Sequence, residues 1–167
     1  LALARRFVRR HGVAVCAIDA IDHGERGSIV DTGDGPPQPE FMALWKQADT
    51  FDRMNADWSA TLDELLASGV FDPESIGYWG LSMGTILGLP FVASEPRITA
   101  AVLGACGFAG PGAIRGAFAG RHRADAPNVT CPVLFMAQWD DEIFGRDGAL
   151  ELFDLIGSPD KRLHAHP

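Results

Sequence analysis

The sequence has few cysteines, a deficit of positive charge and no long apolar run. Its 167 residues include 14 Lys and Arg against 22 Asp and Glu, which gives a formal net charge of −8 at pH 7. An acidic chain repels phosphate backbones, so this balance argues against nucleic acid as a partner. Because no apolar run approaches the roughly 20 residues that a membrane-spanning helix needs, we expect no membrane partner either.

Cysteine is too scarce and too scattered to build a metal site. Its three positions, Cys16, Cys106 and Cys131, are far apart and lie in or beside apolar runs. Their spacing matches no C-x-x-C or Cys–His pattern of metal ligands. We therefore expect no metal, buried thiols in a reducing compartment, and a cytoplasmic location. The basic start of the chain lacks the apolar segment and cleavage site of a secretory signal.

The sequence does contain an alternation of strand and helix patterns. Apolar runs typical of buried strands are found at 13–18, 76–79, 98–106 and 133–137, and a further strand-like run at 161–166. Helical spacing of apolar residues is found at 1–10, 40–68, 83–95 and 145–156. Long surface loops are expected at 20–39 and, with one short helix, at 107–130.

Strands that alternate with crossover-length helical segments form a parallel sheet. We therefore predict an α/β fold, with a doubly wound, mostly parallel sheet and helices on both of its faces. No internal repeat and no shift in composition marks a second domain. The expected organisation is a single domain over residues 1–167.

The sharpest motif is Gly-Leu-Ser-Met-Gly at residues 80–84, which matches G-x-S-x-G. The string alone is a weak signal, and an ordinary Gly-rich turn is the alternative interpretation. Here, however, it lies between a predicted strand and a predicted helix, which is typical of a nucleophile elbow. Such a turn strains the serine backbone, and flanking glycines avoid Cβ clashes. We predict Ser82 as the nucleophile and the Met83 N–H as an oxyanion donor.

A serine hydroxyl needs a base, and the base needs an orienting acid. With this motif the acid and then the histidine follow the serine along the chain. The acid is expected after the second strand beyond the serine, which is the run at 133–137. Three carboxylates, Asp140, Asp141 and Glu142, follow that run. Their spacing alone does not choose among them.

Four segments together resemble the α/β-hydrolase superfamily, and in particular its dienelactone-hydrolase and acyl-esterase branch. They are residues 22–27 (DHGERG), 80–84 (GLSMG), 131–135 (CPVLF) and 141–144 (DEIF). In that branch the aspartate that opens a D-x-x-V/F-P stretch is the acid of a catalytic triad. Residues 141–144 fit this stretch, with glycine where proline is usual. The resemblance therefore implies Asp141 as the acid in preference to Asp140.

The resemblance also implies features beyond both ends of the sequence. In relatives the base is a histidine in a loop just after the last core strand, and a second oxyanion donor precedes the first helix. This sequence ends in a strand-like run with His164 and His166, and no donor segment precedes Leu1. We expect a fragment whose base lies beyond Pro167, with His164 or His166 as the alternative base, of which His166 lies nearer the end of the run. His23 is interpreted as a loop-packing residue.

The expected function is a serine hydrolase that cleaves an ester or related acyl bond in a small molecule. A Ser-His-Asp triad would act through an acyl-enzyme, with no cofactor. Acyl transfer or peptide cleavage on the same fold is one alternative, and a non-catalytic binding protein with a hydrolase fold is another. The loops at 20–39 and 107–130 would line the mouth of the site. The oligomeric state is left open.

Overall fold

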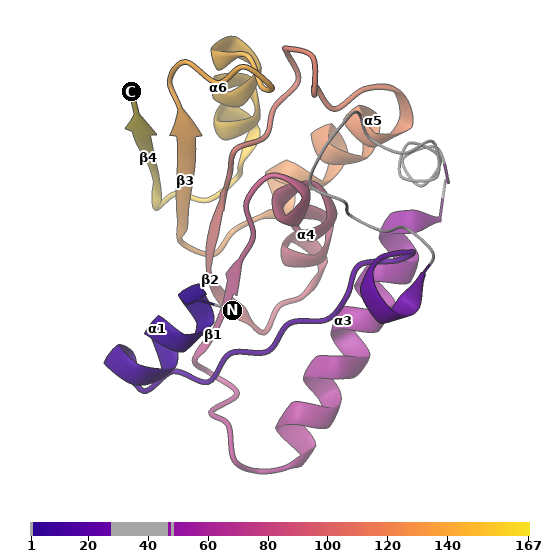
Figure 1. Ribbon diagram of the computed structural model, residues 1–167, viewed down its shortest axis with the longest axis vertical. Helices are drawn as coiled ribbons and strands as arrows, with labels where there is room; N and C mark the ends of the chain where they lie inside the picture. Colours follow the sequence, from indigo (N-terminus) through magenta and orange to yellow (C-terminus); the bar gives the residue numbers. More distant parts are fainter. Residues whose placement is uncertain (1, 28–46, 48) are drawn as a thin grey trace. The chain divides into compact units, whose positions relative to one another are not determined.

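The computed structural model describes residues 2–27, 47 and 49–167 (Figure 1). The chain forms two compact units, Leu1–Leu44 and Trp45–Pro167. Most of the loop expected at 20–39 and the first part of the helix expected at 40–68 lie outside the described residues. A single domain over the whole chain stays a prediction.

The first unit contains helix α1 (Ala2–His11), as expected, and the short 3₁₀ helix η1 (Gly24–Arg26). The strand expected at 13–18 is wrong for this structure, because that segment has no regular secondary structure. Val13 is 50% exposed, and Cys16 is exposed although we expected a buried thiol. A strand needs a hydrogen-bonded neighbour, and the described residues of this unit supply none.

The second unit contains a four-stranded parallel sheet, visible in Figure 1. Its strands are β1 (Ile76–Trp79), β2 (Ile98–Gly104), β3 (Val133–Gln138) and β4 (Lys161–His166), in the spatial order β1-β2-β3-β4. Each strand agrees with an expected strand segment to within two residues at either end. The expected parallel α/β architecture is therefore confirmed.

Helices precede β1 and connect the strands of this sheet. They are α3 (Thr50–Ala67), α4 (Met83–Ser94), α5 (Gly116–Asp125) with the 3₁₀ helix η2 (Ala126–Asn128), and α6 (Arg146–Leu155). Helix α4 leads from β1 to β2, α5 and η2 lead from β2 to β3, and α6 leads from β3 to β4. The short helix expected within 107–130 is thus present as α5.

The crossover helices lie on one face of the sheet, because successive parallel strands are neighbours and such connections are right-handed. The side chains of β3 alternate accordingly. Phe135 is 0% exposed and packs against Phe153 of α6, with ring centroids 5.9 Å apart, whereas Leu134 on the other face is 38% exposed. A helix layer on that second face, which the sequence also predicts, stays a prediction.

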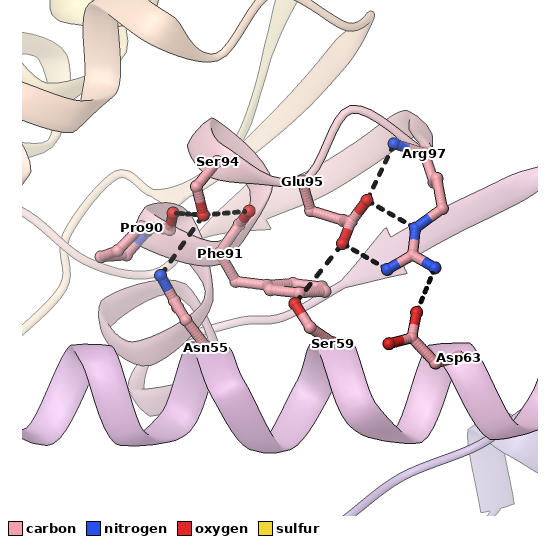
Figure 2. A network of polar contacts seen from close by, with 8 residues as sticks. All are labelled: Asn55, Ser59, Asp63, Pro90, Phe91, Ser94, Glu95 and Arg97. Carbon is pink, nitrogen blue, oxygen red and sulfur yellow. Dashed lines mark hydrogen bonds and ion pairs between the residues drawn. The ribbon is translucent and has the colours of Figure 1, made fainter.

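A polar network joins α3 to the turn between α4 and β2 (Figure 2). The Glu95 carboxylate, in a residue only 8% exposed, accepts hydrogen bonds from Nε and Nη2 of Arg97, each at 2.7 Å. Ser59 Oγ of α3 donates to Glu95 at 3.4 Å, and Arg97 Nη1 donates to Asp63 of α3 at 2.6 Å. The hydrogen bonds from Arg97 hold the pKa of Glu95 below its usual value. The network thereby fixes the far end of α4 against α3.

Glu95→Gln is expected to lower the free energy of unfolding at pH 7 by about 1–3 kcal/mol, because Arg97 loses the more buried of its two charged partners. The folded pKa of Glu95 is lower than its ordinary value of 4.5. The contribution of its charge is therefore fully present above pH 4.5 and is lost as the pH falls through the folded pKa. In urea unfolding, the gap between wild type and variant should narrow on acidification.

The matched control for this measurement is Asp63→Asn, because the Asp63 side chain is 65% exposed. Exposed ion pairs contribute little to stability, so this variant should unfold almost as the wild type does. Equal losses of unfolding free energy in the two variants, or a loss in Glu95→Gln that does not change with pH, would contradict a stabilising role for the Glu95 charge.

Candidate active site

The strand–turn–helix setting expected around the serine motif is present in the second unit. β1 ends at Trp79, α4 begins at Met83, and Ser82 lies just before α4 with φ 53° and ψ −117°. A residue other than glycine at such a positive φ is strained, and strain of this kind collects at functional turns. The turn is held by hydrogen bonds from Ser82 N to Gly104 O at 2.9 Å and from Thr85 N to Ser82 O at 2.8 Å.

The first glycine of the motif allows the strand end and the helix to pack closely. A Cβ at Gly80 would clash with the backbone of Gly84 and the ring of Tyr78. The Tyr78 hydroxyl donates to Gly84 O at 2.7 Å, and burial raises the pKa of Tyr78. A Cβ at Gly84 would meet nothing within 4 Å. The steric reason expected for the flanking glycines therefore holds for Gly80 and not for Gly84.

The hydroxyl of Ser82 and the N–H of Met83 lie together at the start of α4. Ser82 is exposed, and its side chain makes no capping hydrogen bond to the helix. The first N–H groups of a helix have no partner within it, and they carry the positive end of the helix dipole. The Met83 N–H is the first of these groups in α4, and its role as an oxyanion donor stays a prediction.

Of the three candidate acids after β3, Asp141 is held by backbone hydrogen bonds. Its Oδ1 accepts the backbone N–H groups of Ile143 at 2.7 Å and Phe144 at 3.0 Å. One carboxylate oxygen thus fixes the side chain, and no described residue donates a hydrogen bond to Oδ2. Asp140 instead pairs with Arg146 at 3.0 Å, and its side chain is 80% exposed. The two neighbours thus differ in their contacts, and Asp141 as the acid stays a prediction.

The third carboxylate, Glu142, is exposed and lies in the same loop. The loop also presents Trp139, which is 39% exposed. The guanidinium of Arg146 stacks on this indole, 4.1 Å from the ring centroid. An aromatic face and a cation therefore lie in the same loop as the candidate acid.

The loops that follow β2 and β3 bind each other through their backbones. Gly112 N donates to Ile143 O at 2.8 Å, and Gly145 N donates to Ala109 O at 2.9 Å. The carboxyl ends of parallel strands meet at one edge of a sheet, where ligands of such folds bind. The serine turn after β1 and the acid loop after β3 therefore share that edge, on either side of β2.

The histidine of the expected triad is not brought to Asp141 within the described residues. His166 pairs with Gln138 and His164 with Met136 in the register of β3 and β4, and the two histidine rings are 4.5 Å apart between centroids. Residues paired across parallel strands share a face, so both rings lie opposite the crossover helices. The Asp141 carboxylate bonds to backbone N–H groups and to neither ring. His166 as the base stays a prediction.

Another histidine, His122 of α5, is fully enclosed. It is 0% exposed, its Nδ1 lies 2.8 Å from Phe118 O, and its ring meets Phe51 of α3 edge-on, with centroids 5.4 Å apart. Burial lowers the pKa of His122, which favours the neutral ring. A side chain so enclosed packs α5 against α3 and does not meet a substrate.

The DHGERG segment, which lies in the first unit, folds around Asp19. The Asp19 carboxylate accepts a hydrogen bond from the backbone N–H of Glu25 at 2.9 Å. The backbone carbonyl oxygen of Asp19 accepts one from Arg26 Nη1, also at 2.9 Å. Gly24 has φ 55°, and a Cβ there would clash with the Asp19 side chain. His23 Nδ1 lies 2.7 Å from Ile21 O. These contacts are local and agree with a loop-packing role for His23.

The described residues hold no group of three or more His, Cys, Asp and Glu side chains that could bind a metal ion. None of the helices in the described part of the chain is both long and apolar enough to cross a membrane. Among the cysteines, Cys106 is buried as expected and Cys131 is partly buried.

Comparison with solved structures finds esterases and a lipase. A PEG-bound cold-adapted esterase from an Arctic intertidal metagenomic library is 38% identical, with a TM-score of 0.72 over 89% of this chain and 58% of that one. The native structure of such an esterase is 39% identical, with a TM-score of 0.67 over 78% of this chain and 55% of that one. This chain thus spans less than two thirds of the esterases it matches.

A monoacylglycerol lipase from Paleococcus ferrophilus has a TM-score of 0.55 over 70% of this chain and 65% of its own, at 12% identity, so its likeness concerns the fold alone. No protein-family model and no curated protein matches the chain. The esterases and the lipase agree with the parallel sheet and its crossover helices. This chain has the α/β-hydrolase fold.

Proposed function

We propose that this chain carries the nucleophile and the acid of a serine hydrolase that cleaves an ester or related acyl bond in a small molecule. The observation that carries the proposal is Ser82, exposed and strained on the turn that opens α4. The esterase at 38% identity supports an ester as the substrate. Membership of the dienelactone-hydrolase and acyl-esterase branch, and a cytoplasmic location, rest on the sequence alone.

In the proposed reaction, Ser82 Oγ attacks the carbonyl carbon of the ester and a histidine takes its proton. Negative charge then develops on the carbonyl oxygen, where the Met83 N–H and the positive end of α4 stabilise it. The tetrahedral species expels the alcohol, which receives the proton from the histidine, and an acyl group remains on Ser82. Water activated by the same histidine releases the acid and restores the serine.

Asp141 is proposed as the group that orients the histidine and stabilises its protonated form. The two backbone hydrogen bonds to Oδ1 support this role because they fix the carboxylate before the histidine binds to Oδ2. His166 is the candidate base within the chain. To act, its ring must leave the sheet face that it occupies beside Gln138.

The test is turnover of p-nitrophenyl esters of increasing acyl length by the full-length protein. Saturable release of nitrophenol and free acid is the expected result. Cleavage of peptides but not of esters, or transfer of the acyl group to an added alcohol without hydrolysis, would replace this proposal with another use of the fold. Failure to turn over any ester would favour a non-catalytic binding protein.

A further inference from the structure

The hydroxyl of Thr85 lies between the serine turn and the end of β2. Thr85 belongs to the first turn of α4 and is 0% exposed. Its Oγ1 lies 2.8 Å from Gly80 O, 2.7 Å from Gly104 O and 2.7 Å from Gly104 N. Gly80 directly follows β1 and opens the serine turn, and Gly104 is the last residue of β2. The Thr85 hydroxyl therefore contacts the ends of both strands.

The hydroxyl replaces a backbone hydrogen bond of the sheet. Gly80 N donates to Val102 O, and Ser82 N donates to Gly104 O, each at 2.9 Å. In a regular parallel ladder the N–H of Gly104 would donate directly to Gly80 O between these two bonds. Here Thr85 Oγ1 accepts the Gly104 N–H instead. Its single hydrogen is then donated to one of the two nearby carbonyl oxygens.

This bridge lies where the backbone of both strands departs from regular geometry. Gly104 has φ 140°, Ala105 has φ 47°, and Ser82 has φ 53°. A Cβ at Gly104 would clash with the backbone of Met136 in β3. The end of β2 therefore bends against β3 at the residue that donates to Thr85. A bridge through the Thr85 hydroxyl is longer than a direct hydrogen bond between Gly104 N and Gly80 O. The extra length lets the chain turn away from the sheet at Ser82.

The bent end of β2 also leads toward the candidate acid. The loop that follows it donates from Gly112 N to Ile143 O at 2.8 Å. The N–H of Ile143 in turn donates to Asp141 Oδ1 at 2.7 Å. Through one loop, the segment that Thr85 fixes thus contacts the turn that holds Asp141.

We propose that Thr85 is a positioning residue whose hydroxyl bridge between Gly80 and Gly104 holds Ser82 in its strained, reactive conformation. Being buried beneath the turn, Thr85 does not touch the substrate and acts through Ser82. This inference rests on the proposed hydrolase function. Its chemistry requires a hydroxyl at this position, and an apolar group of the same shape cannot bridge the two backbone groups.

The test compares Thr85→Val, which removes the hydroxyl but keeps the shape, with Thr85→Ser, which keeps the hydroxyl. In ester hydrolysis by the full-length protein, Thr85→Val should lower kcat about 10- to 100-fold, because a small misplacement of the reacting group has effects of that size. KM should change by less than about twofold, since ground-state binding is not altered. Thr85→Ser should restore most of the wild-type kcat.

The matched control is Thr99→Val. Thr99 Oγ1 donates to Ile76 O at 3.0 Å, so it also joins β1 to β2, but at the opposite end of the strands. This variant should keep the wild-type kcat. If Thr85→Val keeps the wild-type kcat, or if it loses kcat no more than Thr99→Val does, the inference is overturned while wild-type turnover upholds the hydrolase.

A structural measurement separates this inference from the function itself. If the wild type hydrolyses no ester, the proposed function fails, and crystal structures of Thr85→Val and Thr85→Ser then decide the inference. Ser82 should leave the positive φ region in the valine variant only. An unchanged Ser82 in that variant overturns the bridge. Should Thr85→Val fail to fold, Thr85→Ala takes its place in both comparisons.

Discussion

Replacing Ser82 by alanine is expected to lower kcat for ester hydrolysis by about 10⁴- to 10⁶-fold, the range that removal of a catalytic serine produces. Without Oγ no bond to the acyl group can form, and the Met83 N–H has no attached oxyanion to stabilise. Alanine and serine both carry a Cβ, so the strain at φ 53° is the same and the fold should be kept. Steady-state kinetics with a p-nitrophenyl ester measure the loss of kcat, and circular dichroism checks that the fold is kept.

The control for this variant is Ser68→Ala, because Ser68 is an exposed serine just after α3, where its hydroxyl donates to Leu65 O. It should turn over ester at the wild-type rate. Retention of most of the turnover in Ser82→Ala would remove this serine from the mechanism. The proposed function would then need another nucleophile.

Asp141→Asn is expected to lower kcat by about 10³- to 10⁴-fold, because the protonated histidine loses the charge that stabilises it. The asparagine oxygen can still accept the N–H groups of Ile143 and Phe144, so the loop should keep its structure. Kinetics at saturating ester measure the loss, and thermal unfolding checks that stability is unchanged.

Asp140→Asn provides the comparison one residue away. It breaks only the ion pair between Asp140 and Arg146, whose side chains are 80% and 43% exposed, respectively. Exposed ion pairs of this kind contribute little to stability. Its kcat should stay close to that of the wild type. If Asp140→Asn loses activity and Asp141→Asn does not, Asp140 is the acid.

β2 and β3 could be predicted from the sequence because a buried parallel strand leaves an apolar run, whereas β4 holds no buried residue and its segment was predicted from a strand-like pattern alone. β1 and β4 have the expected bounds, and β3 is longer by one residue. The run at 13–18 has the same pattern but forms no strand in this structure. An apolar run predicts that a segment is buried, but a strand forms only where a neighbouring strand accepts its hydrogen bonds. The described part of the first unit contains no strand next to residues 13–18.

The serine turn could also be predicted, because its motif restricts the backbone locally and requires a glycine at position 80. The Thr85 bridge could not, because it depends on how β1 and β2 pair at Gly104. The choice of Asp141 over its neighbour came from a family resemblance and not from spacing. Likewise, the face on which His166 lies is set by the pairing of β4 with β3.

Covalent labelling of the full-length protein with a fluorophosphonate tests the central claim most directly, because the reagent reacts with an activated serine and not with an ordinary one. Peptide mass spectrometry should find one phosphonyl group per chain, on Ser82, and Ser82→Ala should take up none. A protein that stays unlabelled, or whose label lies on another residue, would contradict the assignment of Ser82 as the nucleophile.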